Sequence, residues 1–384
     1  MPRLRMGMIG GGLESLAGGL HRYAAALDGG IDFVAGALAS SPERAQAAAQ
    51  AFHVARSYAS WQQMLEAEQS LPQSERIDFI VIATPNHLHF PIAKACLAAD
   101  FDVVCDKPLT HALSEAKELA QLAAERNGVF ALTHNYTGYP MAKQARHMIA
   151  AGELGDILKV TVEYHQGWLL QRLEHEGNRQ AAWRTDPQRS GRGGALADIG
   201  THAELQMRYM TGLRIESLCA DLGRQHGRAL DDDASILLYL DGGARGVLTA
   251  SQVLNGEEND LNVRIYGSRG SLTWKQQEPE TLTLRRNDQP IQILRKGEPY
   301  LCEAAKRATR LPPGHPEAFI EAFANVYLNA TGAIRARKAG RAATALESDF
   351  PTAEDGLLGM AFIEAAVDSD AGSAKWTAMA PYLQ

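Results

Sequence analysis

Two ionisable residues, Asp198 and His202, stand four positions apart in a run whose composition predicts a helix over 198–210. Residues at i and i+4 lie on one helix face. An imidazole titrates near neutral pH and a nearby carboxylate biases it, so the pair suits general acid–base catalysis. The preceding Gly193-Gly194 lets a backbone or a ligand come close. The same spacing also occurs in structural hydrogen bonds, so the pair alone leaves both interpretations open.

A second candidate is Lys107, in Asp106-Lys107-Pro108, directly after an apolar strand predicted over 102–105. A lysine at the carboxyl end of a buried strand can stabilise negative charge that develops on a substrate oxygen. The alternative is a turn with solvated charges.

His87 and His89 resemble a metal pair, but no carboxylate or cysteine completes the ligand set. We interpret them as loop and cap residues and predict no metal site.

The elements that must position these residues begin with an apolar run over 6–9, which ends in Gly10-Gly11-Gly12 and leads into a helix over 18–27. A strand, a glycine turn and a helix in that order are typical of dinucleotide binding. Gly10 would make the tight turn, and Gly12 would let the backbone approach a pyrophosphate at the helix N-terminus. The third glycine of the usual pattern is displaced to Gly18.

Strands and helices then alternate along the first third of the chain. Strands are predicted over 33–38, 77–83, 102–105 and 129–133, and helices over 42–52, 60–68, 89–99 and 114–127. Such alternation predicts a doubly wound parallel sheet of the Rossmann type, here over residues 1–135. Ligands of these sheets bind beyond the carboxyl ends of the strands, where Thr84-Pro85-Asn86 and Lys107 would lie.

The end of the second strand bears on cofactor choice. NAD-binding sheets usually place an acid there, whereas this chain reads Leu38-Ala39-Ser40-Ser41. The missing acid permits NADP, whose 2′-phosphate would meet Ser40, Ser41 or Arg44. No arginine stands directly at the strand end, so we predict NAD and keep NADP as the alternative.

The remainder, residues 136–384, predicts an α+β domain built on a large antiparallel sheet. A helix is expected over 140–151 and strands over 157–164, 215–222, 234–240, 244–254, 261–266, 271–275 and 281–284, with closing helices over 317–329 and 353–367. Asp241-Gly242-Gly243 predicts a hairpin, and Asp231-Asp232-Asp233 a solvated turn. The irregular stretch 165–194 predicts a substrate-side loop, whose Trp168, Trp183 and Arg184 would either contact a polyol ring or pack together.

Composition limits the classes of protein. The 384 residues suffice for two domains, and 45 acidic against 38 basic side chains argue against nucleic-acid binding. The four cysteines have no C-x-x-C spacing, which disfavours structural zinc and a disulfide framework. No signal-peptide pattern or membrane-spanning apolar run occurs, so we expect no membrane association and a cytoplasmic location.

Several motifs occur together and in order. They are Ile9-Gly10-Gly11-Gly12, Gly18-x-x-His21, Thr84-Pro85-Asn86 with His89, Asp106-Lys107-Pro108, Gly194 through Asp198 to His202, and Ile265 through Trp274. Taken jointly they resemble the Gfo/Idh/MocA family, the relatives of glucose–fructose oxidoreductase and inositol dehydrogenase. The resemblance runs to about residue 275. Asp106 stands where the family has glutamate, and the glycine loop carries an insertion.

The resemblance implies a nicotinamide-dependent dehydrogenase that oxidises a ring hydroxyl of a sugar, anhydrosugar or inositol to a ketone. His202 would take the hydroxyl proton, Lys107 would stabilise the alkoxide, and Asp198 would hold Lys107 or the substrate. Cofactor contacts are expected from Gly10, Gly12, Leu13, Ser40, Ser41, Arg44, Thr84, Pro85, Asn86, His89, Asp106, Lys107 and Asn135. Substrate contacts are expected from Lys107, Tyr164, Trp183, Arg184, Asp198 and His202.

The resemblance also suggests a homo-oligomer, a dimer or tetramer, paired through the exposed face of the second domain's sheet. Two other functions remain open. One is a redox-neutral glycosidase that uses NAD to oxidise a sugar transiently. The other is a catalytically silent nucleotide-binding regulator, against which the joint presence of Lys107, Asp198 and His202 counts.

Overall fold

The computed structural model describes residues 2–384, which pack as two units. The first contains the chain up to Asn135 together with Phe319–Gly356, and the second contains Tyr136–Ala318 and Leu357–Gln384. The predicted second domain, 136–384, included residues 319–356. They pack in the first unit because the helix that they begin with buries its apolar side chains in that unit's core.

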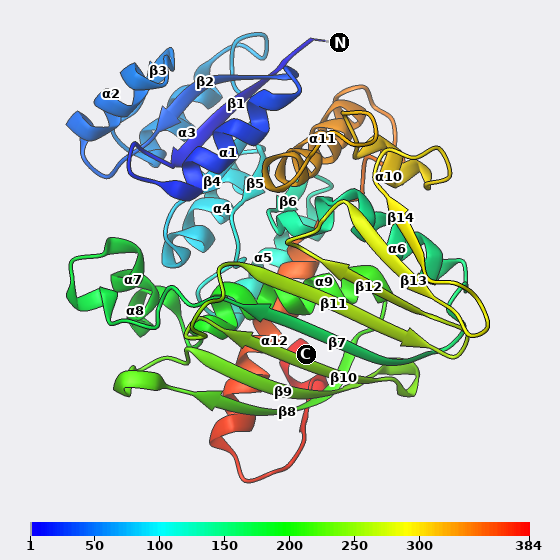
Figure 1. Ribbon diagram of the computed structural model, residues 1–384. Coiled ribbons are helices and arrows are strands. Elements are labelled where there is room, and N and C mark those ends of the chain that lie inside the picture. Colours follow the sequence, from blue (N-terminus) through cyan, green and yellow to red (C-terminus); the bar gives the residue numbers. More distant parts are fainter. Residues whose placement is uncertain (1) are drawn as a thin grey trace. The chain divides into compact units, whose positions relative to one another are not determined.

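Within the described residues, the first unit is built on a parallel sheet, as predicted (Figure 1). The sheet has six strands, of which the short β3 was not predicted. The order is β3-β2-β1-β4-β5-β6. The strands are β1 (Leu4–Gly10), β2 (Ile31–Ala37), β3 (Arg56–Ser57), β4 (Phe79–Ala83), β5 (Asp102–Cys105) and β6 (Phe130–Leu132). Every residue of β4 is buried, which explains its continuous apolar sequence.

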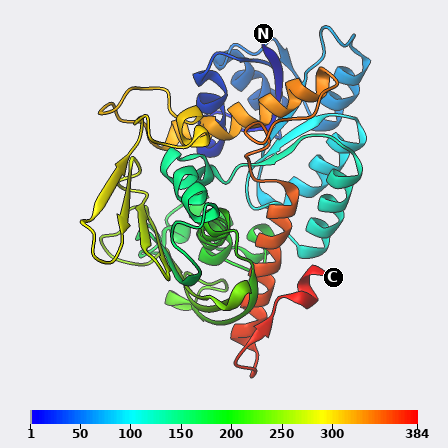
Figure 2. The same ribbon diagram turned by 90° about the vertical axis from the view of Figure 1, so that its right-hand side faces the viewer.

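The helices of this unit are α1 (Leu16–Leu27), α2 (Pro42–Ala51), α3 (Trp61–Ser70), α4 (His89–Ala98), α5 (Leu113–Glu125) and α11 (Phe319–Lys338). Serine side chains cap three of them: Ser15, Ser41 and Ser60 each accept a hydrogen bond from a backbone N–H in the first turn. In Figure 2 the orange α11 lies beside the blue α1. Phe323 and Tyr327 of α11 join the same buried cluster as residues of β1.

Within residues 136–384, nine strands form the sheet of the second unit (Figure 1). Its order is β14-β13-β12-β11-β7-β10-β9-β8-β15. The strands are β7 (Ile157–His165), β8 (Ile215–Gly223), β9 (Asp233–Leu240), β10 (Arg245–Ser251), β11 (Asp260–Gly267), β12 (Ser271–Lys275), β13 (Thr281–Arg285), β14 (Gln292–Arg295) and β15 (Thr377–Ala378). β7 pairs with β10 in parallel, whereas its other neighbour, β11, is antiparallel. The predicted hairpin joins β9 and β10 at residues 241–243, and the edge strands β14 and β15 escaped prediction.

The helices of the second unit are α6 (Pro140–Ala150), α7 (Arg179–Arg184), α8 (Pro187–Ser190), α9 (Thr201–Thr211), α10 (Glu303–Arg307), the greater part of α12 (Ala353–Ala371) and α13 (Ala380–Leu383). α9 packs on β7, β10 and β11 and so covers one face of the sheet. The stretch predicted as irregular, 165–194, contains α7 and α8. Across residues 2–384, no helix is long and apolar enough to cross a bilayer.

Candidate active site

The glycine loop after β1 has the close helix packing of a dinucleotide site despite its insertion. A Cβ atom on Gly18 would lie 2.3 Å from Gly11 Cα, so only glycine lets α1 approach the loop this closely. Gly18 thus does the packing that the third glycine of the usual pattern does. The extra residues, including Leu13 and Glu14, project from the loop and are exposed. The sequence departure therefore lengthens the loop and leaves the helix contact intact.

Lys107 follows the carboxyl end of β5, in a segment held by its neighbours. The Asp106 carboxylate accepts hydrogen bonds from Lys107 N (2.9 Å) and from Thr133 Oγ1 (3.1 Å). The buried His89 ring places Nδ1 2.8 Å from the Pro108 carbonyl oxygen and Nε2 2.9 Å from the Thr84 carbonyl oxygen. His89 therefore ties together the loops after β4 and β5. It is a positioning residue for the Lys107 segment.

Two buried polar atoms at this edge of the sheet suit contacts to a bound nucleotide. Thr84 Oγ1 follows β4 and Asn135 Nδ2 lies just beyond β6, and neither has a hydrogen-bond partner within residues 2–384. Buried polar groups are usually satisfied, so unsatisfied atoms at the ligand-binding end of a sheet fit a ligand's oxygens. Together with the glycine loop, they make the first unit fit NAD.

In the first unit, His21 of α1 contacts Tyr327 of α11, with Nδ1 2.6 Å from the hydroxyl. Burial lowers the pKa of His21 to about 4, so the imidazole is neutral at physiological pH. Burial raises the pKa of the Tyr327 hydroxyl, which therefore keeps its proton. The pair is a neutral link between α1 and α11. Sequence reasoning missed Tyr327 because it lies outside the motifs and 306 residues away.

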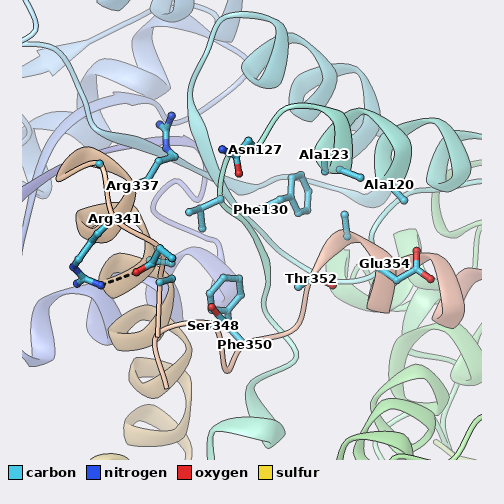
Figure 3. A pocket seen from close by; sticks show the side chains of 18 residues that line it. Ala120, Ala123, Asn127, Phe130, Arg337, Arg341, Ser348, Phe350, Thr352 and Glu354 are labelled. Atoms are coloured by element: carbon cyan, nitrogen blue, oxygen red, sulfur yellow. Dashed lines mark hydrogen bonds between the residues drawn. The ribbon is translucent and has the colours of Figure 1, made fainter. Parts of the chain in front are cut away.

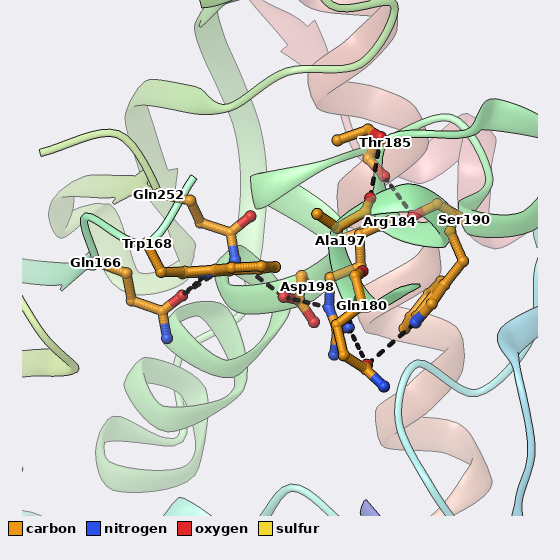
Figure 4. A network of polar contacts seen from close by, with 12 residues as sticks. Gln166, Trp168, Gln180, Arg184, Thr185, Ser190, Ala197, Asp198 and Gln252 are labelled. Carbon is orange, nitrogen blue, oxygen red and sulfur yellow. Dashed lines mark hydrogen bonds and ion pairs between the residues drawn. The ribbon is translucent and has the colours of Figure 1, made fainter. Parts of the chain in front are cut away.

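In the second unit, Asp198 is the centre of a polar network (Figure 4). Its Oδ2 accepts hydrogen bonds from Arg184 Nε (3.0 Å) and from Gln252 Nε2 (2.9 Å). The Arg184 guanidinium also lies over the Trp183 ring, 4.3 Å from its centroid. Gln166 Oε1 accepts hydrogen bonds from Gln252 Nε2 and from the indole Nε1 of Trp168, each at 3.0 Å. The carboxylate is thus oriented from two sides by fixed donors.

His202 lies beside a cluster of tyrosines and is 7% exposed. Its ring packs edge-on against Tyr136, with centroids 4.9 Å apart. Tyr136 and Tyr164 hydroxyls lie 2.5 Å apart, Tyr164 donates to Asn259 Oδ1 (2.8 Å), and Asn259 Nδ2 donates to the Tyr136 hydroxyl (3.2 Å). Burial raises the pKa of both tyrosines, so these hydroxyls stay protonated. The Tyr164 hydroxyl, predicted to contact substrate, is engaged within this cluster.

The Gln166 side chain joins the two clusters, because its Nε2 donates to Asn259 Oδ1 at 2.7 Å. The predicted residues Tyr164, Trp183, Arg184, Asp198 and His202 therefore belong to one connected group within the second unit. Sequence reasoning missed Tyr136, Gln166, Gln252 and Asn259, which have no motif. Of these four residues, Gln166 and Gln252 could have been noticed, because they directly follow the strands β7 and β10.

The segment that carries Asp198 is not the regular α-helix that the spacing predicted. Leu196–Gly200 forms a π-helical turn, and α9 begins only at Thr201. Asp198 thus lies in the π turn and His202 in the first turn of α9. Inserted π turns widen a helix locally and often occur at functional sites.

The prediction of a solvated turn at Asp231-Asp232-Asp233 is wrong. Asp231 is 4% exposed and accepts hydrogen bonds from the backbone N–H groups of Gly194 (2.6 Å) and Leu196 (2.7 Å). Burial raises the pKa of its carboxyl group to about 6. Asp232 is buried as well and pairs with Arg228 at 3.0 Å. Asp231 therefore fixes the start of the Asp198 segment.

The first unit also contains a cavity of about 800 Å3, away from the predicted site (Figure 3). Its walls come from the end of α5, the start of β6, the end of α11 and the start of α12. An ion pair, Arg341–Glu347, lies at one side, with 2.7 Å between Nη2 and Oε1. The cavity lies at the amino end of β6, whereas Lys107 follows a carboxyl end of the parallel sheet. The cavity therefore lies at the edge of the sheet opposite the one where the nucleotide is expected to bind.

Among residues 2–384, no cluster of three His, Cys, Asp or Glu side chains could hold a metal ion.

Comparison with known proteins assigns this geometry to a family. Residues 4–136 match the oxidoreductase family model with an NAD-binding Rossmann fold, and residues 142–273 match the GFO/IDH/MocA C-terminal domain. The uncharacterized oxidoreductase YfiI of Bacillus subtilis is 32% identical over 97% of this chain and 96% of its own length. Levoglucosan dehydrogenase of Pseudarthrobacter phenanthrenivorans is 28% identical over 73% of this chain and 76% of its own.

Solved structures agree with the sequence matches. An inositol dehydrogenase homologue from Azotobacter vinelandii, complexed with NAD+, superimposes with a TM-score of 0.92 and 34% identity, covering 98% of this chain and 97% of that one. A levoglucosan dehydrogenase in complex with NADH and levoglucosan gives a TM-score of 0.83 at 25% identity, covering 98% and 99%. These matches span both units. The chain belongs to the Gfo/Idh/MocA family of NAD-binding oxidoreductases.

Proposed function

We propose that the protein oxidises a ring hydroxyl of a sugar, anhydrosugar or inositol to a ketone, with NAD as hydride acceptor. Two of the relatives are a levoglucosan dehydrogenase and an inositol dehydrogenase homologue. Levoglucosan and inositol are both rings that carry several hydroxyls. The same relatives are seen with NAD+ or NADH. These likenesses support a polyhydroxylated ring as the substrate class.

The observation that carries the proposal is the connected group around Asp198 and His202. A carboxylate, a guanidinium, two carboxamides and two indoles are held together by hydrogen bonds and a cation–π contact. The His202 imidazole packs edge-on against Tyr136 of the adjoining tyrosine cluster. Carboxylates and amides bind ring hydroxyls, and indole faces pack on the C–H surfaces of a sugar ring. A small group with a single hydroxyl would not need this combination.

The mechanism assigns one task to each of three side chains. The His202 imidazole accepts the proton of the substrate hydroxyl. The Lys107 ammonium stabilises the alkoxide that develops as the proton leaves. Asp198, oriented by Arg184 and Gln252, accepts a hydrogen bond from the substrate and favours the protonated imidazole. NAD, when bound beside the glycine loop, supplies the acceptor for the hydride that leaves the same carbon. The products are a ketone, NADH and one proton.

The test is a screen of inositols, pyranoses and anhydrosugars with NAD and with NADP, followed by the absorbance of the reduced cofactor. On the best substrate, Lys107→Met and His202→Ala should each lower kcat by about 100-fold or more, because general acid–base and charge stabilisation contribute on that order. Lys94→Met and His147→Ala change exposed residues of the same types and should keep normal turnover.

Near-normal turnover in both catalytic variants, with NAD binding intact, would show that these residues do not perform the chemistry. Glycoside cleavage without accumulation of NADH would point instead to redox-neutral hydrolysis. Nucleotide binding with no turnover on any ring would indicate a regulatory protein.

A further inference from the structure

The ribose end of the nucleotide site lacks its usual acid. In sheets of this type, a carboxylate at the end of the second strand accepts hydrogen bonds from the adenosine ribose. Here β2 ends at Ala37 and continues as Leu38-Ala39-Ser40-Ser41. The Ser41 hydroxyl is already the N-cap of α2, accepting from Arg44 N at 3.3 Å. Neither the strand end nor the cap supplies a carboxylate.

The glycine loop passes directly over this strand end. A Cβ atom on Gly12 would lie 2.6 Å from the Leu38 carbonyl oxygen, so the two backbones touch. β1 and β2 are adjacent and pair up to Ile9 and Ala37, which places the loop after β1 beside the end of β2. Glu14 stands two residues beyond Gly12, in the inserted part of the loop. The insertion therefore adds a carboxylate to the loop whose Gly12 lies against this strand end.

An ion pair spans the two loops. Arg44 Nη2 lies 3.1 Å from Glu14 Oε2, and the side chains are 61% and 63% exposed. Arg44 belongs to the first turn of α2, and Glu14 to the segment before α1. An exposed pair of this kind contributes little to folding. Its position beside a nucleotide site, however, makes it available to a ligand.

We infer that Glu14 takes the place of the missing strand-end acid and makes the protein select NAD over NADP. Its carboxylate accepts hydrogen bonds from the ribose hydroxyls of NAD. In NADP, the 2′-phosphate would face this carboxylate, and like charges repel. The same carboxylate engages Arg44, the cation that would otherwise bind the 2′-phosphate. The inference rests on NAD binding by the first unit and does not depend on which ring is oxidised.

The experiment measures nucleotide dissociation constants on the full chain by titration calorimetry, without substrate. In Glu14→Gln, which keeps the shape and removes the charge, the ratio of Kd for NADP to Kd for NAD should fall at least about tenfold, or ~1.4 kcal/mol. NADP should bind more tightly and NAD less tightly than in the wild type. Arg44→Ala in that background should abolish the gain for NADP, and added salt should weaken it.

Glu43→Gln is the matched control, because it removes an exposed acid from the same helix turn without touching the ion pair. It should leave the ratio unchanged. The inference is overturned if Glu14→Gln changes the ratio by less than about twofold, if Glu43→Gln has the same effect, or if the wild type binds NADP more tightly than NAD. Loss of ring oxidation with this nucleotide selectivity intact would count against the proposed substrate alone.

Discussion

Replacing Asp231 with asparagine removes a buried charge from the base of the Asp198 segment. In the wild type, the two carboxylate oxygens accept from the backbone N–H groups of Gly194 and Leu196. Asparagine has one acceptor oxygen, so one of those N–H groups loses its partner. It also does not titrate. We therefore expect the difference in stability between wild type and Asp231→Asn to depend on pH.

The magnitude follows from the pKa of Asp231, which burial raises from 3.8 to about 6. The folded protein then binds the carboxyl proton more tightly than the unfolded chain by about 3 kcal/mol. Because the folded pKa is the higher one, this contribution is complete below pH 3.8 and is lost as the pH rises through 6. Between about pH 5 and pH 7.5 the loss amounts to roughly 1.4 kcal/mol.

Hydrogen exchange is the suitable assay, since a chain of two units need not unfold in one step. The free energy of local opening is measured for a peptide covering residues 190–202 in both proteins, at a series of pH values. The stability of the wild type minus that of Asp231→Asn should fall by roughly 1.4 kcal/mol from about pH 5 to pH 7.5. Other titrating groups cancel in this difference. Asp233→Asn, in the same acidic run, should not reproduce the trend.

A difference that stays constant over this pH range would refute the reasoning, because it would mean that Asp231 is already ionised at pH 5. A difference that grows with pH would also refute it, because the carboxylate would then be stabilised and not penalised by its surroundings.

Three further substitutions test other contacts. Gly18→Ala should weaken NAD binding at least about tenfold, because the new Cβ meets loop backbone at 2.3 Å and no rotamer relieves it; an unchanged Kd by calorimetry would contradict this packing. Asn259→Leu removes one hydrogen bond from each of two buried tyrosine hydroxyls, which still bond to each other, and should lower the free energy of urea unfolding by about 1–3 kcal/mol in total. It should also lower kcat through His202, and unchanged kcat would separate the cluster from catalysis. Arg228→Ala removes the cation that pairs with the buried Asp232 carboxylate and should lower the free energy of unfolding by about 3–5 kcal/mol. Thermal unfolding measures this loss. A melting temperature unchanged within error would show that the ion pair is dispensable.

Much of the first unit could be predicted because its signals are local. The buried strand β4 is continuously apolar, and the serine caps stand directly before their helices. The partner of α11 could not be predicted in this way. A helical pattern shows that one face is apolar, but it does not say which core that face joins. Tyr327 therefore had no visible connection to His21.

In the candidate site too, residues with a local sequence signal could be predicted, and residues brought in from distant parts of the chain could not. Lys107 could be found because it directly follows a predicted strand. Asp231 was misjudged because three consecutive acids are typical of a solvated turn. The N–H groups that make its burial tolerable come from residues 35 and 37 positions away in the sequence. Asn259 and Gln252 belong to no motif, and only the fold reveals that they orient the tyrosines and Asp198.

The packing of α11 against α1 has a consequence for how the protein is made. The ribosome completes residues 2–135 first, but the core of that unit still lacks Phe323 and Tyr327, which are synthesised after the whole segment 136–318. Until then, the side chains of this cluster that pack against α11 lack that contact. The first unit is thus completed only after residues 136–318 have been synthesised, and a truncation before residue 319 would leave its apolar core exposed to aggregation.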